Sequence, residues 1–361
     1  MKHSDPLYFP RASYAKKLLT SLHDGITHAF TLFAPRRMGK TQFLLQDIAP
    51  MAEQIGFNVF YFSFMDDNPD TLAERFQAAL YEFATNKPTE KAKTFFAGVK
   101  KIAAMGVEIE RNESPQTIPP ISNIISHIAN DKRQTLLLLD EVQELARASN
   151  TKDLIRSLRT GLDINQNQIK TIFTGSSTNG LKAIFNDSKA PFFHFAHSLD
   201  FPTLGQDFTD FLADIYEQRT GNATDKAAFY QVFERLQKTP MYMRAIVQDM
   251  IVNPALSLED AADIRLEQIQ ELSDYSGLWA GLKPLDKVLL TDIASGNTSP
   301  YTAASRTHYA EALGIDTVST ANVQGCIRRL ERQELITRDT TNALQINSTA
   351  LKTWILGNLE Q

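Results

Sequence analysis

The sequence contains a single cysteine, Cys326, among 361 residues. A disulfide within the chain is therefore excluded, and one unpaired thiol is typical of a reducing compartment. A long apolar run is also missing: the longest aliphatic stretch, Leu136 to Leu139, is far shorter than the roughly 20 residues that a membrane-spanning helix needs. The first residues, MKHSDPLYFP, lack the apolar stretch of a signal peptide. We therefore expect a cytoplasmic protein that makes no membrane contact.

An excess of positive charge is absent as well. The chain has 37 Lys and Arg residues against 42 Asp and Glu residues, a formal net charge of -5, so the molecule as a whole does not attract nucleic acid. Any basic surface must therefore be local. Apolar residues make up 43% and charged residues 22%, the mixture of a globular protein with a full core. The length predicts two or three domains.

Short apolar runs alternate with helical patterns over the first 205 residues. Nearly continuous apolar runs suit the strands of a parallel sheet that is covered on both faces. The alternation predicts an α/β fold with a doubly wound parallel sheet. The expected strands are residues 28–33, 58–64, 135–139 and 170–174, and the expected helices include residues 70–84, 89–105, 121–130 and 152–163, with a short extended piece at 107–110.

The strand signals stop near residue 207. Residues 207–275 predict helices separated by Gly221, Pro240 and Pro254. Three further helical patterns, at 285–294, 302–313 and 321–335, precede two short alternating strands in ITRDTTNALQIN, which is the winged-helix pattern. We therefore expect an α/β domain with a doubly wound sheet at 1–205, an all-helical lid at 206–276 and a winged-helix domain at 277–361.

The loop after the first expected strand has the composition of a phosphate-binding loop. Residues 34–41, APRRMGKT, follow the pattern G-x-x-x-x-G-K-[ST], with Ala34 in place of the first glycine. Backbone N–H groups at a helix N-terminus can surround a β-phosphate, Lys40 can bridge the β- and γ-phosphates, and the Thr41 hydroxyl can ligate Mg²⁺. The candidate nucleotide-contacting residues are Pro35, Arg36, Arg37, Met38, Gly39, Lys40, Thr41 and Gln42.

A surface turn before a helix is the alternative interpretation of this loop. Ala34 favours the alternative, because a positive φ at that position would cost roughly 1–2 kcal/mol without glycine. A second motif supports the nucleotide site: LLLLDE places Asp140 and Glu141 at the carboxyl end of an expected buried strand, where ligands of open α/β sheets bind. Asp140 would hold Mg²⁺ through water, and Glu141 would take a proton from the attacking water.

The acidic pair has its own alternative, which is to cap the next helix. Both motifs follow apolar strands, in the order that a nucleotide site requires, and together they favour catalysis over capping. The sequence therefore predicts a P-loop ATPase that uses ATP and Mg²⁺, with Lys40 and Glu141 as catalytic residues.

Three stretches, APRRMGKTQFLL, LLLLDEVQEL and IFTGSSTNGLKAIF, together resemble the archaeal-type ATPase family. This family belongs to the signal-transduction ATPases (STAND), neighbours of the AAA+ ATPases and of origin-recognition proteins. The resemblance covers nearly the whole chain and implies a P-loop domain, a helical lid and a winged helix. It also implies that Arg36 and Arg37 match the paired arginines of the family's loop, and that Gln143 matches a family glutamine.

The resemblance implies three further site residues. Ser176 would be the polar sensor of the γ-phosphate or the water, with a helix cap as the alternative role. Pro240, in ThrProMetTyr, would lie against the adenine, with a plain helix-starting proline as the alternative. Arg11 would lie near the nucleotide, and the alternative is an ordinary solvent-facing arginine.

One segment departs from the family. Relatives often carry Pro-Leu-Tyr-Gly-Arg after the sensor helix, whereas residues 191–195 here are PFFHF, without an arginine. Arg156 and Arg159 are alternative fingers for a neighbouring subunit of a homo-oligomer, or simply surface arginines. Without an arginine that stabilises transition-state charge, the isolated subunit is expected to turn over slowly.

The expected winged helix leaves the partner open between DNA and protein. Arg328, Arg329 and Arg332 can form one phosphate-contacting stripe at helical spacing. Residues 276–361 nevertheless hold eight Lys and Arg against eight Asp and Glu, whereas dedicated DNA readers show a basic face. Three functions follow: an ATP-driven switch or remodeller on DNA, a signalling or defence-type ATPase whose winged helix contacts protein or holds it shut, and a degenerate scaffold that does not hydrolyse ATP.

Overall fold

The computed structural model describes residues 5–65, 69–85, 118–147, 151–176, 185, 190, 192–271, 275–297, 299–333, 335–338 and 343–358. The expected helix at 89–105 and the extended piece at 107–110 lie outside these residues. None of the helices in the described part combines the length and the hydrophobicity that crossing a bilayer requires.

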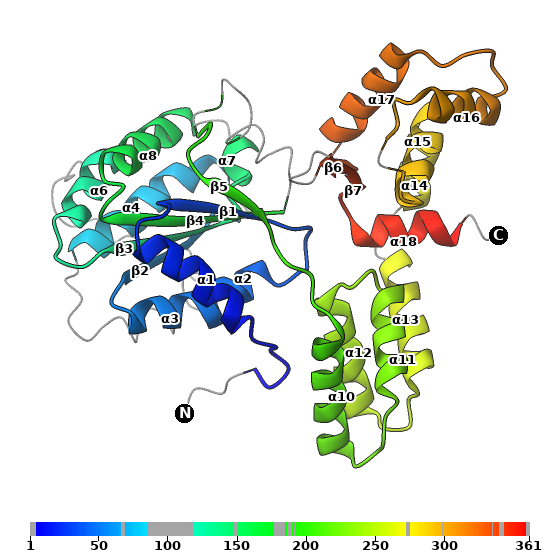
Figure 1. Ribbon diagram of the computed structural model, residues 1–361, viewed down its shortest axis with the longest axis horizontal. Helices are drawn as coiled ribbons and strands as arrows, with labels where there is room; N and C mark the ends of the chain where they lie inside the picture. Colours follow the sequence, from blue (N-terminus) through cyan, green and yellow to red (C-terminus); the bar gives the residue numbers. More distant parts are fainter. Residues whose placement is uncertain are drawn as a thin grey trace.

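A five-stranded parallel sheet forms the centre of the N-terminal half (Figure 1). Its order is β2-β3-β4-β1-β5, so the carboxyl ends of β3, β4 and β1 lie side by side at one edge. The strands are β1 (Ala29–Phe33), β2 (Asn58–Ser63), β3 (Thr135–Asp140), β4 (Ile169–Gly175) and β5 (His197–Asp200). The predicted doubly wound parallel sheet is confirmed. The edge strand β5 was not expected, because His197–Asp200 is short and mostly exposed and therefore has no apolar run.

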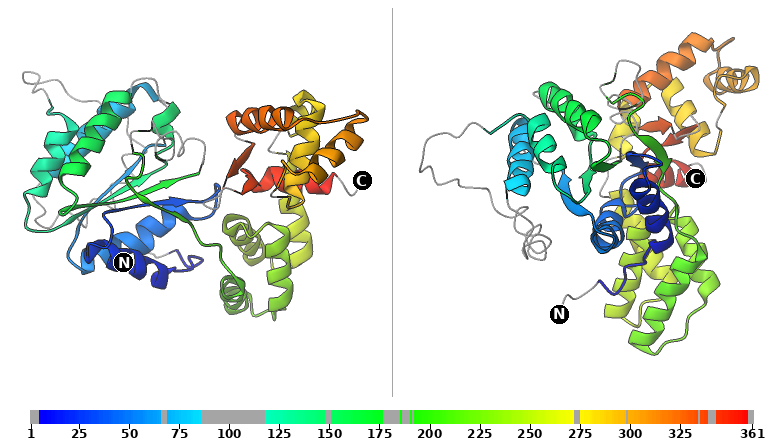
Figure 2. Two further views of the ribbon diagram at one scale, coloured as in Figure 1. Left: turned by 45° about the horizontal axis from the view of Figure 1, so that its top comes forward. Right: turned by 60° about the vertical axis from the view of Figure 1, so that its left-hand side comes forward.

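Helices cover both faces of this sheet (Figures 1 and 2). One face carries α4 (Leu72–Thr85, after the short helix η2, Pro69–Thr71), α6 (Ile121–Ala129) and α8 (Lys152–Ile164), and the other carries α1 (Ala12–His23) and α3 (Ala49–Gln54). Residues of β1 alternate between the two cores: Ala29 and Phe33 join the first, and Phe30 and Leu32 join the second. α8 approaches α6 closely at Gly161, where a Cβ would lie 2.9 Å from Ile125 Cδ1.

The helix after the phosphate loop contains a π-helical segment. It begins as α2 (Lys40–Phe43), continues as η1 (Leu44–Ile48) and ends as α3. The buried Asp47 of η1 accepts hydrogen bonds from the Tyr8 hydroxyl at 2.5 Å and from the Arg11 backbone N–H at 2.9 Å. The N-terminal segment (residues 5–11) is thereby fixed to the helix that follows the loop, and its Leu7 reaches into the core of the helical lid.

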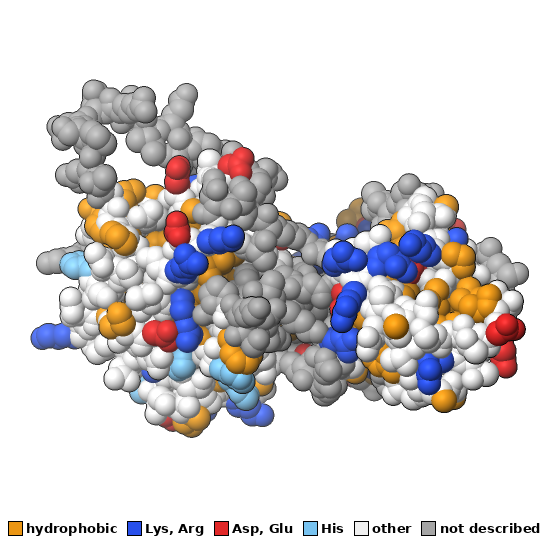
Figure 3. Space-filling view, turned by 90° about the horizontal axis from the view of Figure 1, so that it is seen from above, with side chains coloured by type: hydrophobic (Ala, Val, Ile, Leu, Met, Phe, Trp, Pro, Cys, Tyr) orange, Lys and Arg blue, Asp and Glu red, His pale blue; other side chains and the backbone are white. Residues whose placement is uncertain are grey.

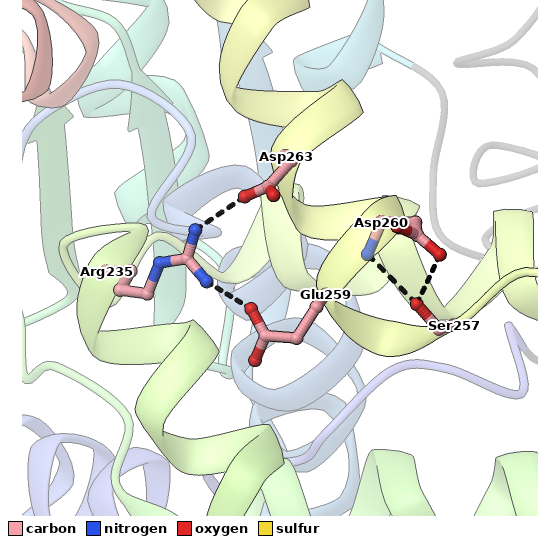
Figure 4. Close-up of polar contacts among 5 residues, drawn as sticks. All are labelled: Arg235, Ser257, Glu259, Asp260 and Asp263. Carbon is pink, nitrogen blue, oxygen red and sulfur yellow. Dashed lines mark hydrogen bonds and ion pairs between the residues drawn. The ribbon is translucent and has the colours of Figure 1, made fainter.

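Four helices form the lid: α10 (Gln206–Thr220), α11 (Lys226–Arg235), α12 (Pro240–Val252) and α13 (Leu258–Glu271). Arg235 of α11 pairs with Glu259 and Asp263 of α13, and Ser257 caps α13 by accepting from the Asp260 N–H (Figure 4). Pro240 occupies the first turn of α12 behind Thr239, which confirms the helix-starting interpretation.

The C-terminal part has the winged-helix arrangement, with α14 (Tyr275–Gly281), α15 (Pro284–Ala294), α16 (Ala303–Leu313), α17 (Thr320–Arg332), the antiparallel pair β6 (Ile336–Arg338) and β7 (Leu344–Ile346), and α18 (Thr349–Gly357). The expected helices and hairpin are confirmed, whereas α14 and α18 were not anticipated. Ala350 of α18 joins the lid core, so the lid and the winged helix share packing. The division at 205/206 and 276/277 stays a prediction, and α14 runs across its second boundary.

A charged pair in the winged helix corrects the expected arginine stripe. Arg329 donates from Nε to Asp286 Oδ2 at 2.9 Å and from Nη2 to Oδ1, and the Asp286 side chain is 2% exposed. Cys326 Sγ also donates to Asp286 Oδ1, at 2.9 Å. Burial raises the pKa of Asp286, but the hydrogen bonds from Arg329 and Cys326 outweigh it and hold the pKa below its ordinary value. Arg329 therefore stabilises the fold, and the exposed arginines of this stripe are Arg328 and Arg332.

Replacing Arg329 by methionine should lower the free energy of unfolding by about 3 kcal/mol, because it leaves a buried carboxylate without its partner. The neighbouring Arg328→Met, at an exposed position, should stay within about 0.5 kcal/mol of the parent. Urea denaturation of both variants measures this.

The pH dependence gives a second test. Because the pKa of Asp286 is lowered in the folded protein, its ionised form stabilises the fold at pH values above the unfolded pKa of ~3.9, and this stabilisation is lost as pH falls through the folded pKa. The deficit of Arg329→Met should therefore shrink in acid, and equal effects of the two substitutions would contradict the structural role.

Candidate functional site

The phosphate loop, residues 34–39, joins the end of β1 to the start of α2. Left-handed backbone occurs at Arg37 (φ 71°) and Gly39 (φ 90°), and Ala34 does not adopt it. The expected strain at Ala34 is therefore wrong: alanine fits there because the left-handed turn lies further along the loop. A non-glycine residue in this conformation costs about 1 kcal/mol, so the surrounding contacts must hold Arg37 in place.

Lys40 is buried within this loop, with 5% of its surface exposed. Its Nζ donates to the carbonyl oxygens of Ala34 at 2.7 Å and Pro35 at 3.0 Å. Burial lowers the pKa of the ammonium, although the nearby Glu141 and Asp140 carboxylates oppose the shift. The cation thus lies inside the loop and near the acidic pair. The other expected loop residues surround it: Met38 is buried, Pro35, Gly39, Thr41 and Gln42 are half-buried, and Arg36 and Arg37 are exposed.

Asp140 is buried at the last position of β3, where it accepts several hydroxyl groups. Thr41 Oγ1 donates to its Oδ2 at 2.6 Å, Tyr61 Oη donates to the same oxygen at 3.2 Å, and Thr174 Oγ1 donates to Oδ1. Burial raises the pKa of Asp140 against the opposing hydrogen bonds from Thr174 and Thr41. The two expected metal ligands are thus in direct contact, and a hydroxyl beside a carboxylate is an oxygen set that suits Mg²⁺ together with nucleotide phosphates.

Glu141 lies just beyond β3 with a left-handed backbone (φ 54°). Its Oε2 accepts from Ser176 Oγ at 2.9 Å and from Gln143 Nε2. Gln143, which precedes α7 (Glu144–Arg147), also accepts at Oε1 from the Ser176 backbone N–H at 3.2 Å. The structure therefore joins the half-buried Glu141 with the buried Gln143 and Ser176 in one polar network. The alternative role of Asp140 and Glu141 as simple caps does not account for these contacts.

Arg11 does not face solvent, so that alternative is wrong. It is 8% exposed, its Nη2 donates to the Met38 carbonyl oxygen at 3.2 Å, and its guanidinium lies 4.5 Å from the centroid of the Phe201 ring. A Cβ on Gly39 would lie 3.5 Å from Arg11 Nη1. Arg11 therefore packs against the phosphate loop at Met38 and Gly39, and its contact with a nucleotide stays a prediction.

The loop also touches the lid. Arg37 Nη1 donates to the Tyr242 hydroxyl, and the Arg37 guanidinium lies 5.1 Å from the Tyr242 ring centroid. Tyr242 belongs to the first turns of α12, two residues after Pro240, and before this helix Gln237 and Lys238 have left-handed backbone. The contact of Pro240 with adenine stays a prediction.

The candidate arginine fingers have different surroundings. Arg156 is exposed, with 77% of its side chain accessible and Asp153 3.8 Å away. Arg159 pairs with Asp163 at 2.8 Å and stacks 4.3 Å from the Phe195 ring centroid. Phe195 stands where the resembling family often has arginine, and His194, at the family's glycine, has a φ of 54°. Arg159 of α8 therefore lies beside the aromatic residue that stands at this position.

Sequence reasoning missed the partners that support these residues. Tyr61 and Thr174 contact Asp140 from the two strands that flank β3, and Tyr242 contacts Arg37 from the lid. For Thr174, a hydroxyl residue at the end of the expected strand 170–174 was the available signal, whereas Tyr61 lies within its strand and gave none. The strand order, which places Tyr61 and Thr174 beside Asp140, could not be predicted from the sequence.

Comparisons with known proteins agree with this arrangement. A family model described as an ATPase domain predominantly from Archaea matches residues 8–236. No curated protein matches the sequence. A Walker-type ATPase of Pyrococcus abyssi has a similar structure with a TM-score of 0.62 at 16% identity, covering 97% of this chain and 96% of that one. The ORC2 protein of Aeropyrum pernix in its ADP form gives a TM-score of 0.54 at 14% identity, covering 99% and 98%.

At these identities the two solved structures show a shared fold. The family model covers more than half of the chain, and it begins in the N-terminal segment and ends with α11. The phosphate loop, the acidic pair after β3 and the parallel sheet all lie within the matched residues. The chain belongs to the family of P-loop ATPases whose ATPase domain occurs predominantly in Archaea.

Proposed function

We propose that this chain binds and hydrolyses ATP with Mg²⁺ and works as a nucleotide-dependent switch. The observation that carries the proposal is the meeting of Lys40, Thr41, Asp140 and Glu141 at one edge of the sheet, with Thr41 Oγ1 2.6 Å from Asp140 Oδ2. Carboxyl ends of parallel strands are where ligands of open α/β sheets bind. A degenerate scaffold that only binds nucleotide would not require Glu141 to be held beside this edge.

Each residue has one task in this proposal. Lys40 leaves the Ala34 and Pro35 carbonyls and neutralises the β- and γ-phosphates. Thr41 and, through water, Asp140 would hold Mg²⁺, which would supply positive charge to the phosphate oxygens. Glu141 orients the attacking water and accepts its proton, and the Ser176 hydroxyl contacts the γ-phosphate or the water. The slow turnover expected for the isolated subunit is consistent with Arg159, whose charge is paired with Asp163.

Lys40→Ala should weaken ATP binding at least about 100-fold, because the ammonium is the main positive charge facing the phosphates. Glu141→Gln should keep ATP affinity within about twofold and lose turnover by about 100-fold or more, because the base is gone while Lys40 and Thr41, which bind the phosphates and Mg²⁺, are kept. Equilibrium binding of labelled ATP and steady-state phosphate release measure the two effects. Lys170→Ala, a buried lysine of β4, is the matched control for removal of a buried ammonium. ATP binding by Lys40→Ala at the parent's affinity would place the phosphate site elsewhere.

The contact between Arg37 and Tyr242 supports the switch. It connects the phosphate loop directly to α12 of the lid, and it lies beside the strained turn at Gln237 and Lys238. A hydrogen bond and a cation–π contact hold the Arg37 guanidinium on Tyr242. If a bound phosphate rearranges the loop, the guanidinium moves and these two contacts change. The lid therefore receives the state of the loop through this pair.

Tyr242→Ala should abolish the ATP-dependent change in hydrogen exchange of α12, because both contacts of Arg37 with the lid are lost. The two contacts together set the size of the coupling, about 1–3 kcal/mol, so the affinity for ATP should change by at most about 150-fold. Tyr230→Ala is the control, since the Tyr230 hydroxyl accepts from Lys238 within the lid, at 2.8 Å. An α12 that still responds to ATP in Tyr242→Ala would remove this route.

Action on DNA is a second proposed function, and the exposed arginines of α17 favour it. Figure 3 shows Lys and Arg side chains gathered on the winged-helix part, at the right of that view. Arg328 and Arg332 are exposed, and Arg332 Nε donates to the Arg328 carbonyl oxygen at 3.3 Å, so both lie on one side of the helix. The alternative is a signalling or defence-type ATPase whose winged helix contacts protein or holds the ATPase shut.

Replacing Arg328 and Arg332 together by alanine should reduce the slope of log affinity for duplex DNA against log salt by roughly two, one for each lost phosphate contact. ATP affinity should stay unchanged, because the loop lies in another part of the chain. Lys16→Ala with Lys17→Ala removes the same charge from exposed positions of α1 and should leave the slope unchanged. Salt titrations measured by fluorescence anisotropy decide it. A parent that does not bind DNA in any nucleotide state would favour the protein-contact alternative.

A further inference from the structure

Gln143 is a fully buried polar residue whose side-chain amide is bonded at both ends. Its exposed fraction is 0%. Oε1 accepts from the Ser176 backbone N–H at 3.2 Å, and Nε2 contacts Glu141 Oε2, Ser176 Oγ at 3.2 Å and Glu144 Oε1 at 3.3 Å. The reverse orientation would set the amide NH₂ against an N–H donor and its oxygen against a carboxylate, so the contacts themselves fix the orientation. The donor end of Gln143 therefore faces Glu141.

The Glu141 carboxylate is held through one of its oxygens. In the described part of the chain, the side-chain donors to this carboxylate, Gln143 Nε2 and Ser176 Oγ, both end on Oε2. Such an arrangement leaves Oε1 as the oxygen that can face the attacking water. The left-handed backbone of Glu141 adds to the constraint, because a non-glycine residue keeps this conformation only when its surroundings hold it.

The two donors differ in what ATP does to them. A serine hydroxyl carries one proton and can donate one hydrogen bond at a time. If Ser176 donates to the γ-phosphate or to the water, its bond to Glu141 Oε2 is given up. The Gln143 amide carries two N–H donors, and its Oε1 is held by the Ser176 N–H, so it can keep its bond to Glu141 Oε2 when the Ser176 hydroxyl turns away. Gln143 is then the donor that remains on Glu141 while ATP is bound.

We propose that Gln143 is a positioning residue, which keeps Glu141 oriented for proton transfer when Ser176 turns to the phosphate. This proposal rests on the proposed function, since it concerns the base of the same reaction. Among the residues that the structure describes, the side chain of Gln143 forms hydrogen bonds with Glu141, Glu144 and Ser176, and none of these belongs to the phosphate loop. Its loss should therefore lower kcat and leave the affinity for ATP unchanged. Removal of a group that orients a functional side chain typically costs 10- to 100-fold.

Gln143→Met keeps the length of the side chain and removes the donor. We expect kcat to fall by about tenfold or more, with the Kd for ATP within about twofold of the parent. Gln143→Glu is a second variant, in which a carboxylate can still accept from the Ser176 N–H but cannot donate to Glu141. It should lose kcat to a similar extent. Gln134→Met is the matched control, because its amide bonds the Asn167 carbonyl oxygen at 2.9 Å, before the start of β3, and kcat should stay unchanged.

A double-mutant cycle with Glu141→Asp separates positioning from a purely structural role. Glu141→Asp shortens the carboxylate by one methylene and breaks its contact with Gln143, so Gln143→Met should cost less than about threefold in that background. An equal loss in both backgrounds, or unchanged kcat in Gln143→Met and Gln143→Glu, would overturn the proposal. If Glu141→Gln turns over ATP as fast as the parent protein, the proposed function itself is overturned, and this inference with it. If Glu141→Gln abolishes the turnover seen in the parent, the proposed function is supported, and the double-mutant cycle then tests the role of Gln143 alone.

Discussion

The rest of the site depends on one buried carboxylate. Asp140 ends β3 with only 1% of its surface exposed, and a negative charge buried to this extent is unfavourable unless hydroxyl and N–H groups surround it. Thr41, Tyr61 and Thr174 supply those hydroxyls from α2, β2 and β4. The Asp140 side chain thus connects the helix that follows the phosphate loop to the strands on either side of β3.

The same requirement accounts for the shape of the chain around Asp140. Glu141 must turn away from the strand at once, and it does so through left-handed backbone that the hydrogen bonds of Gln143 and Ser176 hold in place. Arg37 is the comparable case in the loop, where Tyr242 of the lid holds the guanidinium. In both places a non-glycine residue with left-handed backbone, Arg37 or Glu141, is held by hydrogen bonds of its side chain. Such strain persists only when the surroundings over-determine it.

The sequence was sufficient for those parts of the molecule that follow from local pattern. Apolar runs predicted β1 to β4, and the loop and acidic motifs predicted which side chains meet at their ends. β5 escaped because an exposed edge strand needs no apolar run, and its pairing with β1 depends on the neighbour rather than on His197–Asp200 itself. Support from distant residues escaped for a related reason. Tyr61 and Tyr242 look like ordinary core tyrosines until the strand order and the lid position are known.

Ala34 and Arg329 show how the expectation from residue type alone goes wrong. Glycine was required at position 34 only on the assumption that the left-handed turn lies there, and the backbone makes that turn at Arg37 and Gly39 instead. Arg329 belongs to a balanced charge count, yet the count does not say which arginine is neutralised inside the fold. Asp286 is buried and accepts hydrogen bonds from two nitrogens of Arg329, so the charge of Arg329 is neutralised within the fold although 28% of its side chain is exposed. The positive charge that α17 can offer to a partner is therefore that of the exposed Arg328 and Arg332. The basic surface of this helix is smaller than the three arginines in its sequence suggest.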